Sequence, residues 1–173
     1  MAFQKDAIIT LAIGSEGDLA GKAFYTRDAY LVTDIAGLNI GKFAWKVINT
    51  ESDAVQAKGA NTTLAGLVVR NNTNVNATQG ITTIASMNIR QGQSASIAHA
   101  GDFIVKIQAV EGGSPVAQSS AVYIDNVTGG IIADGGGTMT AYTKTNFLFD
   151  SPSADLIVSG LVKISNVNNV MGV

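Results

Sequence analysis

Hydrophobic and polar residues alternate along much of this chain, and the clearest alternation lies between Gly92 and Asp125. There, Phe103, Val105 and Ile107 alternate with the residues between them, and a second run alternates from residue 122 to residue 125. Period-two alternation of β-branched and aromatic residues, bounded by Gly, Ser and Pro, is typical of half-buried strands. This segment therefore predicts two strands joined by a glycine-rich loop.

The same order of short strand, small-residue turn and short strand recurs through the rest of the sequence. Phe43, Trp45 and Val47 fall on one face of a strand, and Trp45, the single tryptophan, is expected to anchor the first half of the core. Residues 64–70 read as a nearly continuous apolar strand, and residues 156–164 as the last strand. No long window keeps an apolar stripe at helical spacing. About ten short strands, spaced about 8–12 residues apart, predict an all-β sandwich or barrel-like domain of short antiparallel strands with little helix.

The chain divides into an N-terminal arm, residues 1–20, and a β domain, residues 21–173. A weak internal repeat leaves two alternatives open for residues 21–173, a single domain or two similar β lobes. The segments GKFAWKV, VQAKG and LAGLVVRN in the first half pair with SSAVYID, IIADG and IVSGLVKIS in the second.

The arm contains an apolar run from Ala7 to Ile13 that is far shorter than the roughly 20 residues needed to span a bilayer. One Lys and one Asp precede it, so the charged start of a signal peptide is weak. The run predicts an extended arm that docks on another subunit; the alternative is an edge strand of the same domain. The expected contact residues are Phe3, Ile8, Ile9, Leu11 and Ile13.

Composition favours a protein packed against neighbours. Charged residues make up 14% of the chain, against about 25% in an average soluble domain, so much of the surface must be neutral. Net charge is −2 and the basic residues are scattered, which argues against a nucleic-acid partner. The chain has no cysteine, which excludes disulfides, thiolate catalysis and Cys-ligated zinc.

Candidate chemistry is sparse. His99 is the only histidine, and Asp102, Ser94 and Ser96 lie near it in sequence. A Ser-His-Asp set could be drawn from them, but triad members usually converge from distant segments, so a polar surface pair at a turn is the expected arrangement. Asp125 and Asp134 flank a glycine hairpin, but they lack the regular ligand series of a calcium loop. We therefore assign no catalytic, cofactor or metal site.

Four segments carry a family resemblance: LAGLVVR, QGQSASIAHAGDFIVKI, VAQSSAVYIDNVTGGIIADG and LIVSGLVKIS. Their order over residues 40–165 resembles the structural cement (capsid decoration) proteins of tailed bacteriophages. In the position where that family usually carries a glycine and an acid, this chain has Ser119 and Ser120.

The resemblance implies a virion protein, made in the host cytoplasm, that binds the outer head surface and stabilises contacts between major capsid protein subunits. It also implies a homo-oligomer, a dimer or trimer, with no membrane or direct nucleic-acid partner. The arm could add a strand to a neighbour's sheet edge, and the loops at residues 71–80 and 126–146 are further expected contacts.

Besides an enzyme, which is the least favoured, two other classes stay open. One is another phage structural component, such as a tail tube, head fibre or tail fibre subunit. The other is a secreted carbohydrate-binding module, although the sequence shows no row of aromatic residues for sugar stacking.

Overall fold

The computed structural model describes residues 15–20, 26–47, 53–57, 62–70, 88–113, 115–151, 156–158 and 160–166. These residues form twelve strands and no helix, which confirms the all-β prediction. The strands are β1 Thr26–Val32, β2 Leu38–Asn39, β3 Phe43–Val47, β4 Ala54–Gln56, β5 Thr62–Val69, β6 Asn88–Ile89, β7 Ser94–Ala100, β8 Asp102–Glu111, β9 Ala121–Asp125, β10 Ile131–Asp134, β11 Tyr142–Phe149 and β12 Leu161–Ser165.

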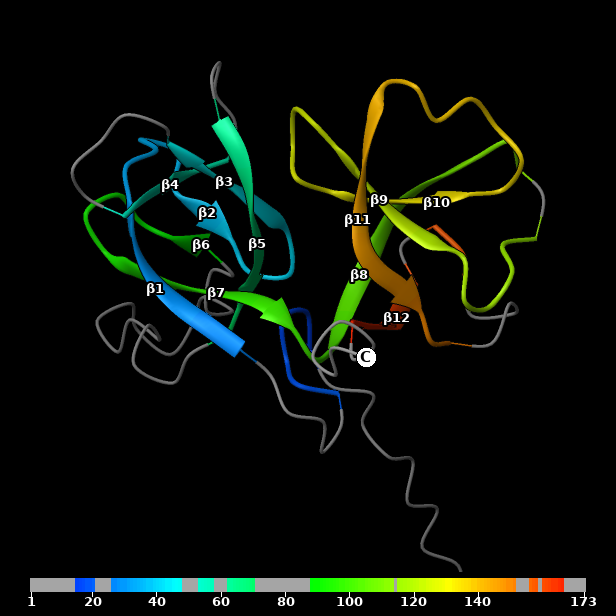
Figure 1. Cartoon of the computed structure of the whole chain (residues 1–173), viewed down its shortest axis with the longest axis horizontal. Helices are drawn as coiled ribbons and strands as arrows, with labels where there is room; N and C mark the ends of the chain where they lie inside the picture. Colours follow the sequence, from blue (N-terminus) through cyan, green and yellow to red (C-terminus); the bar gives the residue numbers. More distant parts are fainter. Residues whose placement is uncertain are drawn as a thin grey trace, which may run out of the picture.

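Ten of these strands close into two barrels that lie side by side (Figure 1). The N-terminal barrel has the strand order β1-β4-β3-β5-β7, and the C-terminal barrel has the order β10-β8-β12-β11-β9. The remaining two strands, β2 and β6, form a small antiparallel ladder of their own.

The two barrels share one topology. Taken in chain order, β1, β3, β4, β5 and β7 make the same set of pairings as β8, β9, β10, β11 and β12. In each barrel the first strand pairs in parallel with the third, as β1 with β4 and β8 with β10, and the other four pairings are antiparallel. The expected antiparallel pairing therefore holds for four of the five pairings in each barrel and fails for one. Strand directions cannot alternate all the way round a closed ring of five strands, so at least one pair must be parallel.

The shared topology also corrects the sequence alignment of the two halves. It matches β3 with β9 and β4 with β10, as the comparison of GKFAWKV with SSAVYID and of VQAKG with IIADG did. It matches β5 with β11, however, and not with the last strand, to which the sequence comparison assigned it.

A single hydrophobic cluster joins the two barrels. Phe43, Trp45 and Leu67 of the N-terminal barrel are buried in the same cluster as Phe103 and Phe147 of the C-terminal barrel. Phe147 meets Phe43 edge to face, with ring centroids 5.7 Å apart, and Phe103 at 6.3 Å. Such aromatic pairs contribute about 0.5–1.5 kcal/mol beyond the area they bury. Trp45 thus anchors a core common to both barrels.

A second cluster, in the N-terminal half alone, joins the N-terminal barrel to the β2–β6 ladder. Its buried members are Tyr30, Val32, Leu38, Ala44, Val55, Ala65, Val68, Ile89, Ala95 and Ile97.

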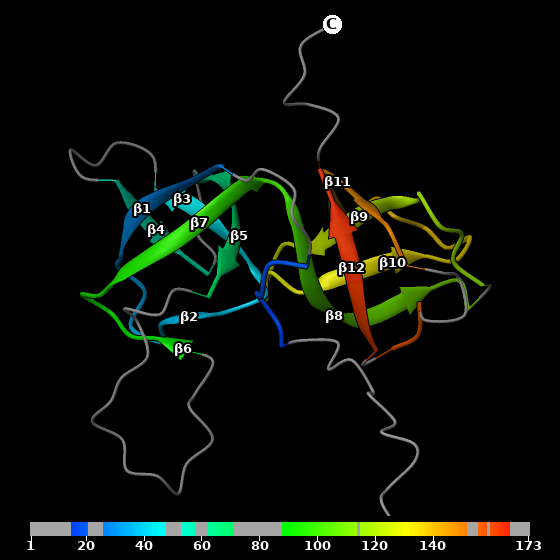
Figure 2. The ribbon, with the colours of Figure 1, turned by 90° about the horizontal axis from the view of Figure 1, so that it is seen from below.

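Residues 15–20 lie in the seam between the barrels, as the dark blue segment of Figure 2 shows. The Gly17 amide donates to the Ile104 carbonyl at 2.8 Å, and the Ile104 amide donates to the Asp18 carbonyl at 2.9 Å. The Arg70 amide, at the end of β5, donates to the Gly17 carbonyl at 3.0 Å. This part of the expected arm is therefore bonded to both barrels, while residues 1–14 lie outside the described residues.

The turn between β9 and β10 reaches from the C-terminal barrel to β3 of the N-terminal barrel. The Phe43 amide donates to the Gly129 carbonyl at 2.9 Å. Gly129 has φ +67°, and a Cβ added there would run into the Phe43 carbonyl oxygen. Only glycine combines this left-handed backbone with so close an approach.

We predict that Gly129→Ala destabilises the protein more than Gly113→Ala. Gly113 has φ +69° but faces no atom within 4 Å, so its substitution should cost only the left-handed strain of about 1–2 kcal/mol. At Gly129 the collision with β3 should add about 1–3 kcal/mol. Urea unfolding of both variants measures the difference, and equal losses would contradict a tight seam at this turn.

Candidate interaction surfaces

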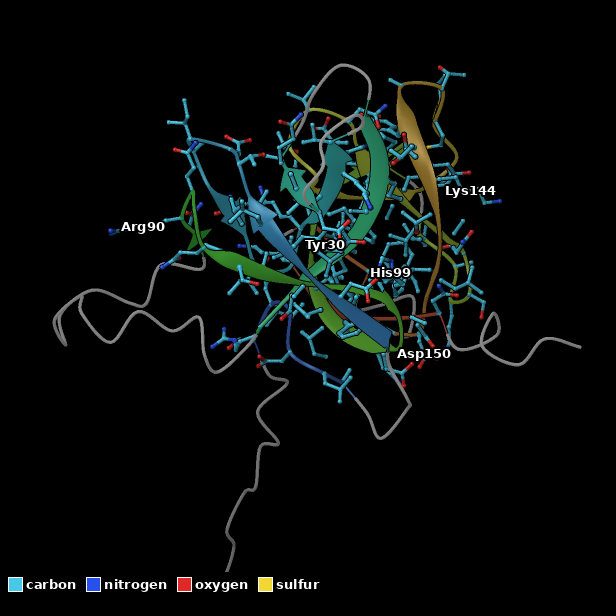
Figure 3. All side chains as sticks on the ribbon, turned by 60° about the vertical axis from the view of Figure 1, so that its left-hand side comes forward. Tyr30, Arg90, His99, Lys144 and Asp150 are labelled. Atoms are coloured by element: carbon cyan, nitrogen blue, oxygen red, sulfur yellow. The ribbon has the colours of Figure 1, made fainter. Side chains whose placement is uncertain are left out.

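The structure does not bring the His99, Asp102 and serine candidates together. His99 lies on β7 rather than at a turn, and its Nε2 is 3.1 Å from Asp28 Oδ2 on β1. The His99 ring also meets Tyr30 edge to face at 6.5 Å (Figure 3). A polar pair is present, but its carboxylate is Asp28 and not Asp102. The two residues are 71 positions apart in sequence, so proximity along the chain suggested the wrong partner.

Asp102 belongs to a different network, at the start of β8. Its carboxylate accepts a hydrogen bond from Ser165 Oγ at 2.6 Å and lies 3.2 Å from Lys163 Nζ. Lys163 also pairs with Asp150 at 2.7 Å. The pKa of Lys163 is raised, mainly by the hydrogen bond to Asp150. Partial burial lowers this pKa, and the hydrogen bond to Asp102 raises it further. Lys163 therefore stays charged between two carboxylates, which suits a structural clamp and not a proton-transfer group.

The carboxylates around the glycine hairpin do not converge on a metal either. Asp125 accepts hydrogen bonds from the Val127 amide at 2.8 Å and from Thr128 Oγ1 at 2.8 Å. Burial tends to raise the pKa of Asp125, but these bonds and one from Gln108 outweigh it and hold the pKa below its ordinary value. Asp134, at the far end of β10, binds the Gly136 amide. The described residues contain no group of three or more His, Cys, Asp or Glu side chains that could hold a metal ion.

Among the exposed aliphatic side chains, which include Ile157 and Val158, two stand on turns whose backbone is hydrogen-bonded by an aspartate carboxylate. Ile35, 89% exposed, follows Asp34, whose carboxylate accepts the Ala36 amide at 2.9 Å and the Ala57 amide at 3.1 Å. Val127, 58% exposed, lies two residues after Asp125 in the β9–β10 turn. One turn belongs to the N-terminal barrel side and the other to the C-terminal barrel. Single exposed apolar side chains are common on protein surfaces; what distinguishes these two is the hydrogen-bonded turn that holds each of them.

A cleft of about 170 Å³, which we call the seam cleft, lies between β5 and β11. Its lining is Phe43, Leu64, Ala65, Gly66, His99, Thr145, Asn146, Phe147 and Asn166. The Asn166 side chain donates to the His99 carbonyl at 2.9 Å and so ties the end of β12 to β7. The lining combines aromatic and aliphatic surface with amide and hydroxyl groups.

The contact residues expected from sequence are only partly described. Phe3, Ile8, Ile9, Leu11 and Ile13 lie outside the described residues, as does the loop at 71–80. The expected loop at 126–146 contains β10 and the first half of β11, and Val127 is its exposed apolar residue. The sequence reasoning missed Ile35, although the run Asp-Ile-Ala-Gly holds an aliphatic residue inside a turn signal.

No described segment is a helix long and apolar enough to cross a membrane.

Comparison with known proteins finds a matching protein family and a similar solved structure. The family model of the XM1 gp53 minor capsid protein matches residues 4–166. Among solved structures, a chain from the capsid of Myoviridae phage XM1 superposes with a TM-score of 0.58 and 17% sequence identity, over 96% of this chain and 98% of that chain. No curated protein sequence matches.

The Lys163 clamp gives a testable difference in stability. Lys163→Met leaves the Asp102 carboxylate, whose side chain is 11% exposed, without its cation, and should cost about 1–3 kcal/mol. Lys46→Met removes the more exposed pair with Asp53 and should cost less, because solvent screens that pair. Denaturant unfolding at neutral pH compares the two. Adding Asp102→Asn should restore part of the loss in Lys163→Met, and equal losses in the two single variants would contradict the clamp.

Proposed function

The chain belongs to the XM1 gp53 minor capsid protein family, and from this premise we propose that it is a cement protein, which binds the outer head surface and holds neighbouring major capsid subunits together. Membership of this family makes the protein a component of the phage virion capsid. A capsid role therefore replaces the alternatives of a tail subunit and a carbohydrate-binding module. The finer assignment, cement rather than another capsid role, rests on the shared core, the exposed anchors and the surface composition.

The observation that carries the proposal is the single core shared by the two barrels. Phe43 and Phe147 come from different barrels and pack against each other. The Phe43–Gly129 hydrogen bond and the residues of the seam segment 15–20 add backbone contacts between the barrels. A protein that resists outward pressure on a shell must carry load between two attachment points without opening. Two barrels fused by a common core supply such a rigid link.

Each half of the molecule offers an exposed aliphatic anchor on a turn held by an aspartate carboxylate. Ile35 and Val127 stand on turns whose backbone is already fixed by Asp34 and Asp125. Binding them therefore costs little conformational entropy, which is a common property of strong contact residues. With one anchor on each half, a single copy could bind two neighbouring capsid subunits. The second attachment then occurs at a high effective concentration.

The surface composition fits a large, weakly charged interface. Charged residues are 14% of the chain and net charge is −2. Interface cores are depleted in charged residues, and repeated sites on a symmetric shell allow each individual contact to be modest. The partner in this proposal is the major capsid protein.

We predict that Ile35→Asp and Val127→Asp each weaken capsid binding by about 10–100-fold, the usual effect of removing a strong contact. Binding is measured by co-sedimentation with capsids that lack this protein. Thr138→Asp, an equal charge change at another exposed position, is the matched control and should bind like the parent. Because all three side chains are exposed, their thermal unfolding should stay close to that of the parent.

The double variant Ile35→Asp with Val127→Asp separates bridging from simple attachment. If the two anchors contact different subunits, each single variant should retain weak binding but lose the added thermal stability of the decorated capsid, and the double variant should not bind. Single variants that bind and stabilise capsids as the parent does would contradict the bridging role.

A further inference from the structure

A second cleft lies where the seam segment 15–20, the start of β3 and the middle of β8 meet. Its volume is about 310 Å³, and we call it the lysine cleft. Its lining is Glu16, Lys42, Lys106, Ile107, Gln108 and Gly130. Lys42 immediately precedes β3 of the N-terminal barrel, and Lys106 lies on β8 of the C-terminal barrel. Each barrel thus contributes one lysine to the same cleft.

Backbone hydrogen bonds fix the position of the walls of the lysine cleft. The Gly17 amide donates to the Ile104 carbonyl at 2.8 Å, and the Phe43 amide donates to the Gly129 carbonyl at 2.9 Å. Gly17, Phe43 and Gly129 are each next in sequence to a lining residue. The walls are therefore in place before any partner binds, which lowers the entropy lost on binding.

The Gln108 side chain is a fixed part of the wall. Its Nε2 donates to Asp125 Oδ2 at 3.4 Å, and its Oε1 lies 2.9 Å from Thr128 Oγ1. A Cβ at Gly130 would collide with this side chain. The charged groups that face the cleft are therefore the two lysines and Glu16.

Both lysines of the cleft lack a paired carboxylate. Among the described residues, ion pairs form at other cations, namely Lys46, Arg70, His99 and Lys163. Glu16 lines the cleft with both lysines but belongs to none of these pairs. The lysine cleft therefore holds two ammonium groups against one carboxylate, on a chain whose net charge is −2.

We infer that the lysine cleft binds a carboxylate of a partner protein, the side chain of an aspartate or glutamate on an exposed loop. One carboxylate has two oxygens and can accept hydrogen bonds from both ammonium groups. The volume of about 310 Å³ is at the lower end of ligand pockets, so it suits a side chain and not an extended segment. A nucleic acid backbone would need a longer run of cations.

The identity of the partner depends on the proposed function. That the carboxylate belongs to the major capsid protein rests on the cement proposal, whereas the binding of a carboxylate rests on the cleft alone. Because Lys42 and Lys106 come from different barrels, the bound carboxylate would also strengthen the link between them.

Nuclear magnetic resonance tests carboxylate binding without capsids. N-acetylglutamate methylamide, a blocked glutamate, is titrated into isotope-labelled protein at low ionic strength. We expect the amide signals of Gly17 and Gly130 to shift, and blocked glutamine, which lacks the charge, to leave them in place. Lys42→Met and Lys106→Met should abolish the shifts. Lys144→Met, which removes an exposed lysine of β11, is the control with equal charge and should keep them.

Co-sedimentation with capsids that lack this protein tests the partner. Lys42→Met and Lys106→Met should each weaken binding at least about tenfold, since each leaves the partner's carboxylate with one cation fewer. Lys144→Met should bind like the parent. Glu16→Gln should strengthen binding, because it removes a carboxylate that repels the incoming one. If the three groups only maintained the fold, all three substitutions in the cleft would weaken binding.

Either of two results would overturn the inference. One is the absence of shifts with blocked glutamate, or equal shifts with blocked glutamine. The other is capsid binding by Lys42→Met and Lys106→Met that matches Lys144→Met; the parent would still bind capsids, so the cement proposal would stand. A parent protein that does not bind capsids, but whose Gly17 and Gly130 signals shift with blocked glutamate, would contradict the cement proposal and support the carboxylate site.

Discussion

The contact between Phe43 and Phe147 is the interaction on which the rest of this structure depends. Each barrel is a small five-stranded unit, and small domains bury too little apolar surface to be very stable alone. Packing Phe43, Trp45 and Leu67 against Phe103 and Phe147 gives both barrels a common interior. The glycine turn at Gly129 and the segment of residues 15–20 fit into the seam only because this core brings the barrels together.

Closure of the barrels decides which surfaces remain for partners. A closed barrel hides the backbone groups that an open sheet would present at its edges. Contacts must then come from side chains on turns, such as Ile35 and Val127, or from clefts where the two barrels meet, such as the lysine cleft.

The sequence predicted the fold class because alternation along each strand is a local signal. It could not predict the pairing of β1 with β4 or of β8 with β10, since that depends on which distant strands meet when a five-membered ring closes. The partner of His99 was missed for a similar reason, because Asp28 lies on a neighbouring strand far away in the chain. Ile35 was missed because burial depends on tertiary packing, and an isoleucine in a turn reads equally well as core.

The measurement that tests the bridging role most directly is a density map of phage heads carrying this protein. We expect both barrels to be resolved as one rigid unit, with the Ile35 side of the N-terminal barrel on one major capsid subunit and the Val127 turn on its neighbour. A map in which both barrels of each copy rest on the same subunit, or in which the barrels adopt varying relative orientations, would contradict this role.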